Sequence, residues 1–324
     1  MATLRELRDR IRSVNSTKKI TKAQELIATS QITKAQQRVA AAKPYADEMT
    51  NVMERLAAAS SLDHPMLRER ENGRVAAILV VTSDRGMAGG YNHNVLKKAA
   101  SLERMLRESG YDVVRYVTGG KGVTHFRFRD MDIAGAWTGW SQKPTWEETH
   151  DVRRHIVDGF LAGSEGEVKW REGLNAPEGE AVPGFDRVHV VYTEFVSMLA
   201  QEARVHQLLP IETNINGSGQ EQEQEASTSG ELQPDMDFEP DPDTLMDKLL
   251  PAYVSRSLYS IFLESSASES ASRRTAMKNA TDNATDLANN LSREANQARQ
   301  AKITQEITEI IGGAGALSGS GESD

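Results

Sequence analysis

Residues that break helices are scarce near both ends of this chain. The first Gly is Gly73, and neither Gly nor Pro occurs between Ala252 and Ile311. Because Gly and Pro are the strongest helix breakers, both ends are predicted to be very long helices. A helix of about 60 residues spans roughly 90 Å. Uninterrupted patterns of that length favour a coiled coil over an ordinary globular helix.

Apolar residues in both end segments recur at alternating spacings of three and four, which is typical of a left-handed coiled coil. The first seam reads Ile32, Ala35, Val39, Ala42, Ala46, Met49, Met53 and Leu56. The last seam reads Met277, Ala280, Ala284, Leu287, Leu291, Glu294, Ala298 and Ala301. Alanine dominates both seams, so the paired rod should be thin, and Pro44 should kink or locally open the first helix.

The pairing of these helices follows from their place in the chain. One chain supplies both helices and a domain lies between them, so antiparallel pairing is expected. The alternative is two separate long helices that each pack on the middle domain.

The middle of the chain is predicted to be α/β. Residues 74–82 form a continuous apolar run, as expected of a strand buried on both faces, and a glycine-rich loop follows at 83–90. Further strands are expected at 112–117, 133–137 and 187–193, with 196–209 pairing back on the last, and helices at 94–109 and 146–161. Strands that alternate with helices favour a mainly parallel sheet.

The predicted fold class is therefore α/β, with a long antiparallel coiled coil of the N- and C-terminal helices and a central Rossmann-like α/β domain. The expected parts are a helix at 1–62, the α/β domain at 73–210, an acidic disordered loop at 211–240, a helix at 241–311 and a flexible tail at 312–324. Residues 163–184, rich in Gly, Glu and Pro, are predicted to be an inserted surface loop. Residues 211–247 carry eleven acidic residues and no Lys or Arg.

The motifs of common enzyme and metal sites are missing. There is no Cys, which excludes a disulfide scaffold, a thiolate zinc site and a cysteine nucleophile. The loop that contains Gly86, Gly89 and Gly90 continues with Tyr91 and Asn92, so it fits neither the P-loop nor the dinucleotide pattern. We expect Asp84 and Arg85 to belong to a structural polar network there. The seven histidines form no compact set with carboxylates, and no cofactor or metal is expected.

The N-terminal helix is strongly basic although the whole chain has a net charge of −9. Residues 1–43 hold ten basic and three acidic residues. Lys18, Thr21 and Glu25 occupy seam positions, where they either face a partner or form a solvated helix face. A nucleic-acid partner is disfavoured because no aromatic residue precedes Tyr45 on which a base could stack. No apolar run approaches the length of a membrane span, and no signal is seen, so a cytoplasmic protein is expected.

Five separated strings, in the same order, resemble the gamma subunit of F-type ATP synthases. They are residues 7–23 (LRDRIRSVNSTKKITKA), 83–92 (SDRGMAGGYN), 239–242 (EPDP), 276–283 (AMKNATDN) and 298–310 (ARQAKITQEITEI). This resemblance implies a coiled coil that stands inside a ring of alpha and beta subunits, above the epsilon subunit and the c-subunit ring. It implies a rotor that couples proton-driven c-ring rotation to the catalytic beta sites. It implies no catalytic residues in this chain, and a peripheral location at the cytoplasmic face of the cell membrane.

The resemblance also implies contact residues. For the alpha/beta ring they are Lys18, Lys19, Lys22, Gln24, Arg299, Gln300, Ile303, Thr304, Ile307 and Ile310. For the foot on the c ring and epsilon they are Arg38, Lys43, Tyr45, Phe238, Glu239 and Asp241. The family commonly has methionine where Gln24 stands and Leu-Cys where Met87 and Ala88 stand, so these contacts differ here. The insert at about 166–183 resembles one in actinobacterial members, and we expect it to approach the c ring or the stalk.

Two other functions are consistent with parts of the sequence. One is an α/β enzyme that binds a phosphorylated ligand and uses the coiled coil as an oligomerisation arm, which ligand binding by the isolated chain would reveal. The other is a basic helical nucleic-acid binder, which would show a steep salt dependence of DNA binding.

Overall fold

The computed structural model describes residues 3–59, 64–211, 239 and 241–319, and at 312–319 and some positions between 43 and 59 it describes the backbone alone. It divides into two compact units. Residues 1–28 and 273–324 make up the first unit, and residues 29–272 make up the second.

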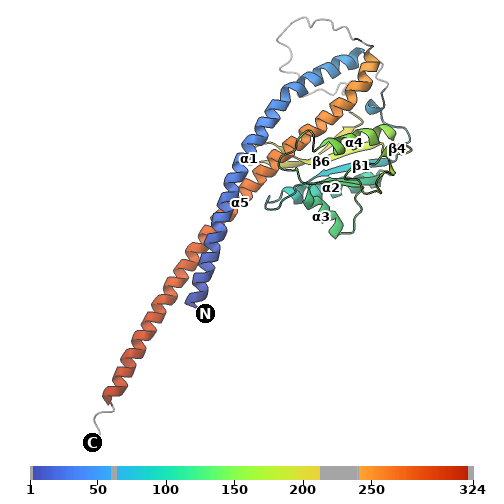
Figure 1. The fold of residues 1–324 in the computed structure, drawn as a ribbon. Helices are drawn as coiled ribbons and strands as arrows, with labels where there is room; N and C mark the ends of the chain where they lie inside the picture. The colour runs from blue at the N-terminus through green and yellow to red at the C-terminus, as the bar shows by residue number, and fades with distance from the viewer. Residues whose placement is uncertain (1–2, 60–63, 212–238, 240, 320–324) are drawn as a thin grey trace. The chain divides into compact units, whose positions relative to one another are not determined.

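Two long helices form the ends of the chain, as predicted (Figure 1). Helix α1 covers Leu4–Ala59 and continues through Pro44, and helix α5 covers Pro242–Gly319 and continues through Pro251. Helix α5 therefore extends beyond Ile311, where the sequence predicted a flexible tail. Extending an existing helix costs far less than starting one, which allows α5 to continue through the glycines that follow.

The first unit is an antiparallel pair of helices (Figure 1). From Met277 onward, the buried side chains in the described part of α5 are Met277, Thr281, Ala284, Ala288 and Leu291. The predicted seam is thus wrong at Leu287, which is 44% exposed, whereas Ala288 is 8% exposed. Both choices keep the alternating spacing, and the smaller residue occupies the closely packed position.

The second unit contains a five-stranded sheet with the order β3-β2-β1-β6-β7. Its strands are β1 (Val75–Val81), β2 (Asp112–Thr118), β3 (Gly135–Trp137), β6 (Arg187–Phe195) and β7 (Gln201–Leu209). The first four are parallel, and β7 pairs back antiparallel on β6. The predicted strands and their pairing are confirmed.

Helices cover both faces of this sheet. On one face, α2 (Tyr91–Glu108) and α3 (Gly120–Phe128) bury Val95, Leu102 and Phe126 against β1. On the other face, α4 (His150–Ala162) and α5 bury Phe160 and Phe262 against β1 and β6. The short η1 (Pro65–Leu67) adds Met66 to this second core. The sequence did not predict α3, because glycines occupy its first turn.

The insert at 163–184, which the composition predicted to be a surface loop, contains two short strands. It forms a two-stranded sheet of β4 (Glu167–Lys169) and β5 (Ala181–Pro183). Leu174 pairs with Gly135 at the edge of β3 and joins the apolar core at 7% exposure. The indole Nε1–H of Trp137 donates to the Glu172 carbonyl at 2.8 Å. The insert therefore covers a sheet edge that would otherwise be open.

Candidate functional site

The basic residues of α1 lie on the surface of the helix pair, whereas their polar seam neighbours do not. Lys19 and Lys22 are exposed, Lys18 is half-buried, and Lys22 pairs with Glu25 at 3.0 Å. Thr21 and Glu25 are 8% and 9% exposed, so they face the inside of the pair and not a partner.

One hydroxyl pair joins the two helices inside the seam. The Thr21 and Thr281 hydroxyls lie 2.7 Å apart, so one donates to the other, and the accepting hydroxyl can donate in turn to a carbonyl of its own helix, that of Lys18 for Thr21 or that of Met277 for Thr281. Both polar groups are therefore satisfied within the pair.

The C-terminal part of α5 presents an exposed apolar stripe. Ile303, Ile307, Ile310 and Ile311 are 47%, 51%, 72% and 67% exposed. Arg299, Gln300 and Thr304 are exposed beside them, and Gln24 of α1 is half-buried. Exposed large apolar side chains gathered on one helix are typical of a protein-binding surface.

The residues expected in the foot belong to the second unit. Arg38 is half-buried, and the ring of Tyr45, which is 54% exposed, lies 4.7 Å from the guanidinium of Arg256. Glu239 and Asp241 are exposed at the start of α5, where Asp241 accepts the Thr244 N–H at 3.0 Å. Phe238 and the side chain of Lys43 lie outside the described residues.

The loop after β1 is held by its own polar groups. The Asp84 carboxylate accepts N–H bonds from Gly120 at 3.0 Å and Ser141 at 2.9 Å. The Ser83 hydroxyl donates to the Arg85 carbonyl at 2.7 Å. Gly89 and Met87 have positive φ angles of 57° and 60°, a conformation that glycine adopts easily and methionine rarely.

These bonds also occupy the place where a phosphate would bind. The N-terminus of α3 follows β2, and its first N–H groups donate to Asp84 Oδ1, the Ser83 carbonyl and the Thr82 hydroxyl, at 3.0, 2.9 and 2.9 Å. A phosphate needs such donors free. Gly119 lies so close to Thr82 that an added Cβ would be 2.1 Å from its carbonyl oxygen. This arrangement disfavours the enzyme with a phosphorylated ligand.

Helix α5 lies at the carboxyl edge of the sheet, in the place where a ligand would bind. In α/β folds of this kind, ligands bind outside the carboxyl ends of the parallel strands. Here Phe195 N–H, at the end of β6, donates to Glu264 at 3.1 Å, and the Tyr91 hydroxyl donates to the Ser265 carbonyl at 3.3 Å. The Ser266 hydroxyl donates to the Gln142 carbonyl at 2.7 Å. Three segments of the domain that are far apart in sequence thus bind one helix.

This contact of α5 was not predicted from the sequence, although the sequence contains a signal for it. Five buried polar residues of α5 lie close together in sequence: Ser265, Ser266, Ser268, Glu269 and Ser270. This run of mostly small, polar residues interrupts the apolar heptads. Such an interruption indicates that the helix contacts backbone groups there and not a second helix.

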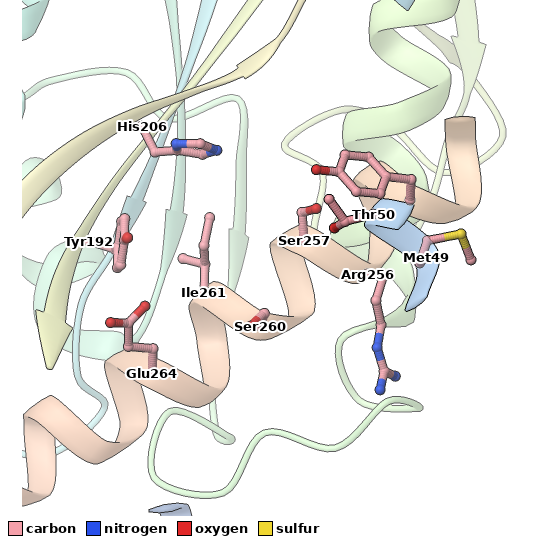
Figure 2. Close-up of a pocket in the computed structure, with 10 residues that line it drawn as sticks. Met49, Thr50, Tyr192, His206, Arg256, Ser257, Ser260, Ile261 and Glu264 are labelled. Atoms are coloured by element: carbon pink, nitrogen blue, oxygen red, sulfur yellow. The ribbon is translucent and has the colours of Figure 1, made fainter. Parts of the chain in front are cut away.

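A cavity of about 290 Å³ lies beside this contact, between α1, α5 and the strands β6 and β7 (Figure 2). Tyr192, His206 and Glu264 line it. Burial, and then the nearby Glu264 and Glu194, raise the pKa of Tyr192 to about 12. Burial raises the pKa of Glu264, although the Phe195 N–H bond opposes the shift. Glu264 fixes the end of β6 to α5, so its role here is structural.

The described residues contain no group of three or more metal-binding side chains. None of the helices in that part of the chain combines the length and apolarity that crossing a membrane requires.

This chain is similar to known proteins over its full length. A family model described as ATP synthase matches residues 3–317. The ATP synthase gamma chains of Corynebacterium glutamicum and Corynebacterium diphtheriae are 72% and 70% identical to it over 325 residues, and all of each chain is covered. That of Rhodococcus jostii is 56% identical over 332 residues, again with full coverage.

Solved structures share the fold. A chain of the Euglena gracilis mitochondrial ATP synthase (OSCP/F1/c-ring, rotational state 3) gives a TM-score of 0.64 at 17% identity, covering 99% of this chain and 96% of that one. A chain of the Tetrahymena thermophila mitochondrial ATP synthase central stalk and c ring gives 0.54 at 18% identity, covering 81% and 99%.

Proposed function

Because the chain belongs to the gamma chain family of ATP synthases, we propose that it is the central rotor shaft of a proton-driven ATP synthase. The observation that carries this proposal is the 72% identity over all of both chains. The paired helices stand in a ring of alpha and beta subunits, and the α/β domain rests beside epsilon on the c ring. Rotation of the c ring turns the shaft, whose asymmetry changes the nucleotide affinities of the beta sites in sequence.

The chain has a mechanical role in this proposal, and bond chemistry belongs to its partners. The crevice that could hold a substrate binds α5, and the N–H groups that could hold phosphate bind the chain's own side chains. The chain is held at the cytoplasmic face of the cell membrane as a peripheral subunit.

Features of the first unit fit such a shaft. Alanine and threonine in its seam allow the helices to approach closely, which suits a narrow bore. Lys18, Lys19 and Lys22 form a basic surface that would attract acidic partner segments over a distance. The exposed isoleucines from Ile303 to Ile311 form an apolar bearing near the tip.

Co-purification tests this proposal directly. Tagged full-length chain, isolated from detergent-solubilised membranes of its own cells, is expected to bring down stoichiometric alpha, beta, epsilon and c subunits. A matched control is the same chain with Ile303, Ile307 and Ile310 changed to Asp, which should keep the c ring and epsilon but lose alpha and beta. Recovery of the tagged chain without these subunits would contradict the proposal.

A further inference from the structure

Two arginines and three aromatic rings are stacked where α1, α5 and the segment before α4 meet. The Arg256 guanidinium of α5 lies 4.7 Å from the ring of Tyr45, 5.6 Å from Trp146 and 5.7 Å from Tyr259. The rings of Trp146 and Tyr259 meet edge to face at 5.2 Å. One cation thus joins rings from three separate parts of the chain.

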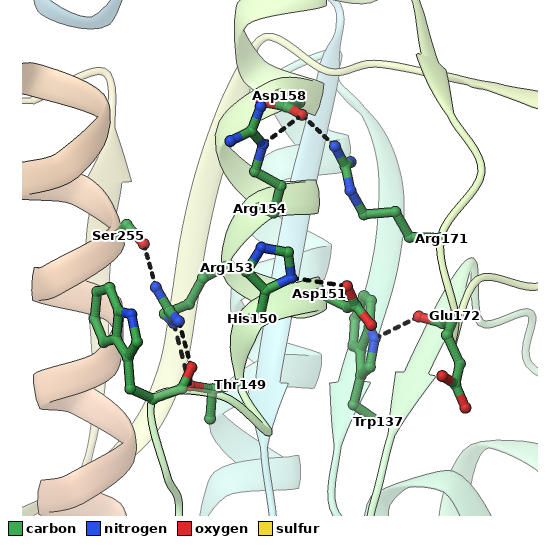
Figure 3. Close-up of polar contacts among 11 residues, drawn as sticks. Trp137, Thr149, His150, Asp151, Arg153, Arg154, Asp158, Arg171, Glu172 and Ser255 are labelled. Carbon is green, nitrogen blue, oxygen red and sulfur yellow. Dashed lines mark hydrogen bonds and ion pairs between the residues drawn. The ribbon is translucent and has the colours of Figure 1, made fainter. Parts of the chain in front are cut away.

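The second arginine fixes this stack to the α/β domain. Arg153 of α4 is 3% exposed, and its guanidinium lies 3.4 Å from the Trp146 ring. Its N–H groups donate to the Ser255 hydroxyl of α5 at 2.6 Å and to the Thr149 hydroxyl at 3.1 Å (Figure 3). A ring and directional hydrogen bonds therefore both contact this buried cation, which fixes its orientation.

A cavity lies next to the stack, so the contact of Tyr45 with Arg256 is important for holding α1 at this level. Met49 and Thr50 of α1 line that cavity (Figure 2), so α1 is not packed tightly against the sheet at this level. About two turns further along, Leu56 is fully buried in the core. Within the described part of the second unit, Tyr45 and Leu56 thus hold α1 on either side of the cavity.

The two kinds of contact resist different motions. Apolar burial holds helices together but is non-directional, so it resists sliding and rotation weakly. A guanidinium stacked on aromatic faces and hydrogen-bonded at its N–H groups has a preferred orientation, and it strengthens when removed from water.

We propose that the stack of Tyr45, Arg256, Trp146 and Arg153 locks α1 and α5 in rotational register with the α/β domain, so that a turning force on the domain passes into both helices. This inference rests on the proposed function. The four residues are positioning residues: they act by holding the two helices.

A graded series at position 45 tests the inference in the complete ATP synthase, in inverted membrane vesicles. The readout is ATP-driven proton pumping divided by ATP hydrolysis. Tyr45→Leu is expected to lower this ratio about twofold to tenfold, since it removes the aromatic face but keeps an apolar side chain. Tyr45→Phe and Tyr45→Trp keep the face and should keep the ratio. Phe128→Leu, the same kind of change at a residue that is 84% exposed, is the control.

A double-mutant cycle separates the stack from a direct contact of Tyr45 with another subunit. Arg256→Met should lower the ratio as far as Tyr45→Leu, and the double variant should be no worse than either. An unchanged ratio in Tyr45→Leu, an equal fall in Tyr45→Phe, or an effect of Tyr45→Leu without one of Arg256→Met would each overturn the inference. If vesicles with the unaltered chain fail to pump, the proposed function itself has failed.

Discussion

The two units of this chain differ in how much apolar surface they bury. In the second unit, Phe160, Phe185 and Phe262 are at most 1% exposed, and the sheet has a core on both faces. In the first unit, the seam is built of alanine, threonine and a few larger side chains, and α5 leaves its isoleucines exposed. Since stabilisation scales with apolar area buried, the second unit is expected to fold by itself and the first to depend on what surrounds it.

The largest expected effect comes from removing the side chain that fixes α5 to the domain core. Phe262 is 1% exposed, and its ring meets Trp140 at 5.0 Å, edge to face. Phe262→Ala should destabilise the second unit by about 3–5 kcal/mol, because it deletes a large buried ring and leaves a cavity. Urea unfolding followed by tryptophan fluorescence measures this. The comparable truncation in the first unit, Leu291→Ala, should shift this transition by less than about 0.5 kcal/mol, and an equal shift would break the comparison.

The second largest effect on stability is expected at Asp186, whose buried carboxylate lies at the start of β1. Asp186 accepts N–H bonds from Arg74, Val75 and Ser164 at 2.8, 3.0 and 3.0 Å, and pairs with Arg70 at 3.2 Å. Burial alone would raise the pKa of Asp186, but the Ser164, Val75 and Arg74 N–H donors outweigh it and lower the pKa to about 2.

A lowered pKa gives this interaction a defined pH window. The native state favours the ionised form, so the stabilisation is complete above about pH 4 and is lost as the pH falls towards 2. Asp186→Asn should lower the free energy of unfolding by about 2 kcal/mol at pH 7 and flatten its decline between pH 4 and 2. Chemical unfolding at a series of pH values checks this. Asp112→Asn, at an exposed position, is the control, and an unflattened decline in Asp186→Asn would refute the assignment.

A smaller effect is expected at the hydroxyl pair of the first unit. Thr21→Val together with Thr281→Val replaces both hydroxyls by methyl groups of similar size. Removing both partners at once leaves no unpaired polar group, so the thermal stability of the helix pair should change by less than about 1 kcal/mol. Circular dichroism of the full chain during heating measures it. A loss much larger than this would mean that the hydroxyl pair, and not close alanine packing, holds the first unit together.

The smallest effect on stability should come from the basic surface of α1. Changing Lys18, Lys19 and Lys22 to Ala removes charges at the outside of the helix pair and the partly exposed ion pair of Lys22 with Glu25, which contributes about 1 kcal/mol. We nevertheless expect lower proton pumping per ATP in the assembled enzyme. Arg5, Arg8 and Arg10 changed to Ala provide a matched set on the same helix. Equal losses of thermal stability and of coupling would count against a partner-contact role.

The sequence predicted the parts that depend on periodicity and local composition. The long helices, the strands and the antiparallel return of β7 follow from spacing and from the missing helix breakers. The seam register at Leu287 was wrong, because spacing alone does not distinguish two neighbouring helix faces.

Periodicity and local composition do not predict contacts between segments that are far apart in sequence. The Gly and Pro content of the insert predicted a loop. Its Leu174 becomes buried by pairing with the edge of β3, which composition does not reveal. The binding of α5 at the carboxyl edge depends on residues such as Tyr91 and Phe195, which are far from Glu264 in sequence. The partner-contact residues were taken from family resemblance, and they remain predictions.

Amide hydrogen exchange distinguishes a second unit that is stable by itself from a first unit that other subunits stabilise. The exchange of every segment should be compared between the isolated chain and the assembled complex. The account predicts that β1, β6 and residues 254–266 of α5 are protected in both, whereas residues 4–28 and 280–311 exchange rapidly in the isolated chain and slowly in the complex. Equal protection of residues 4–28 and 280–311 in the two samples would contradict it.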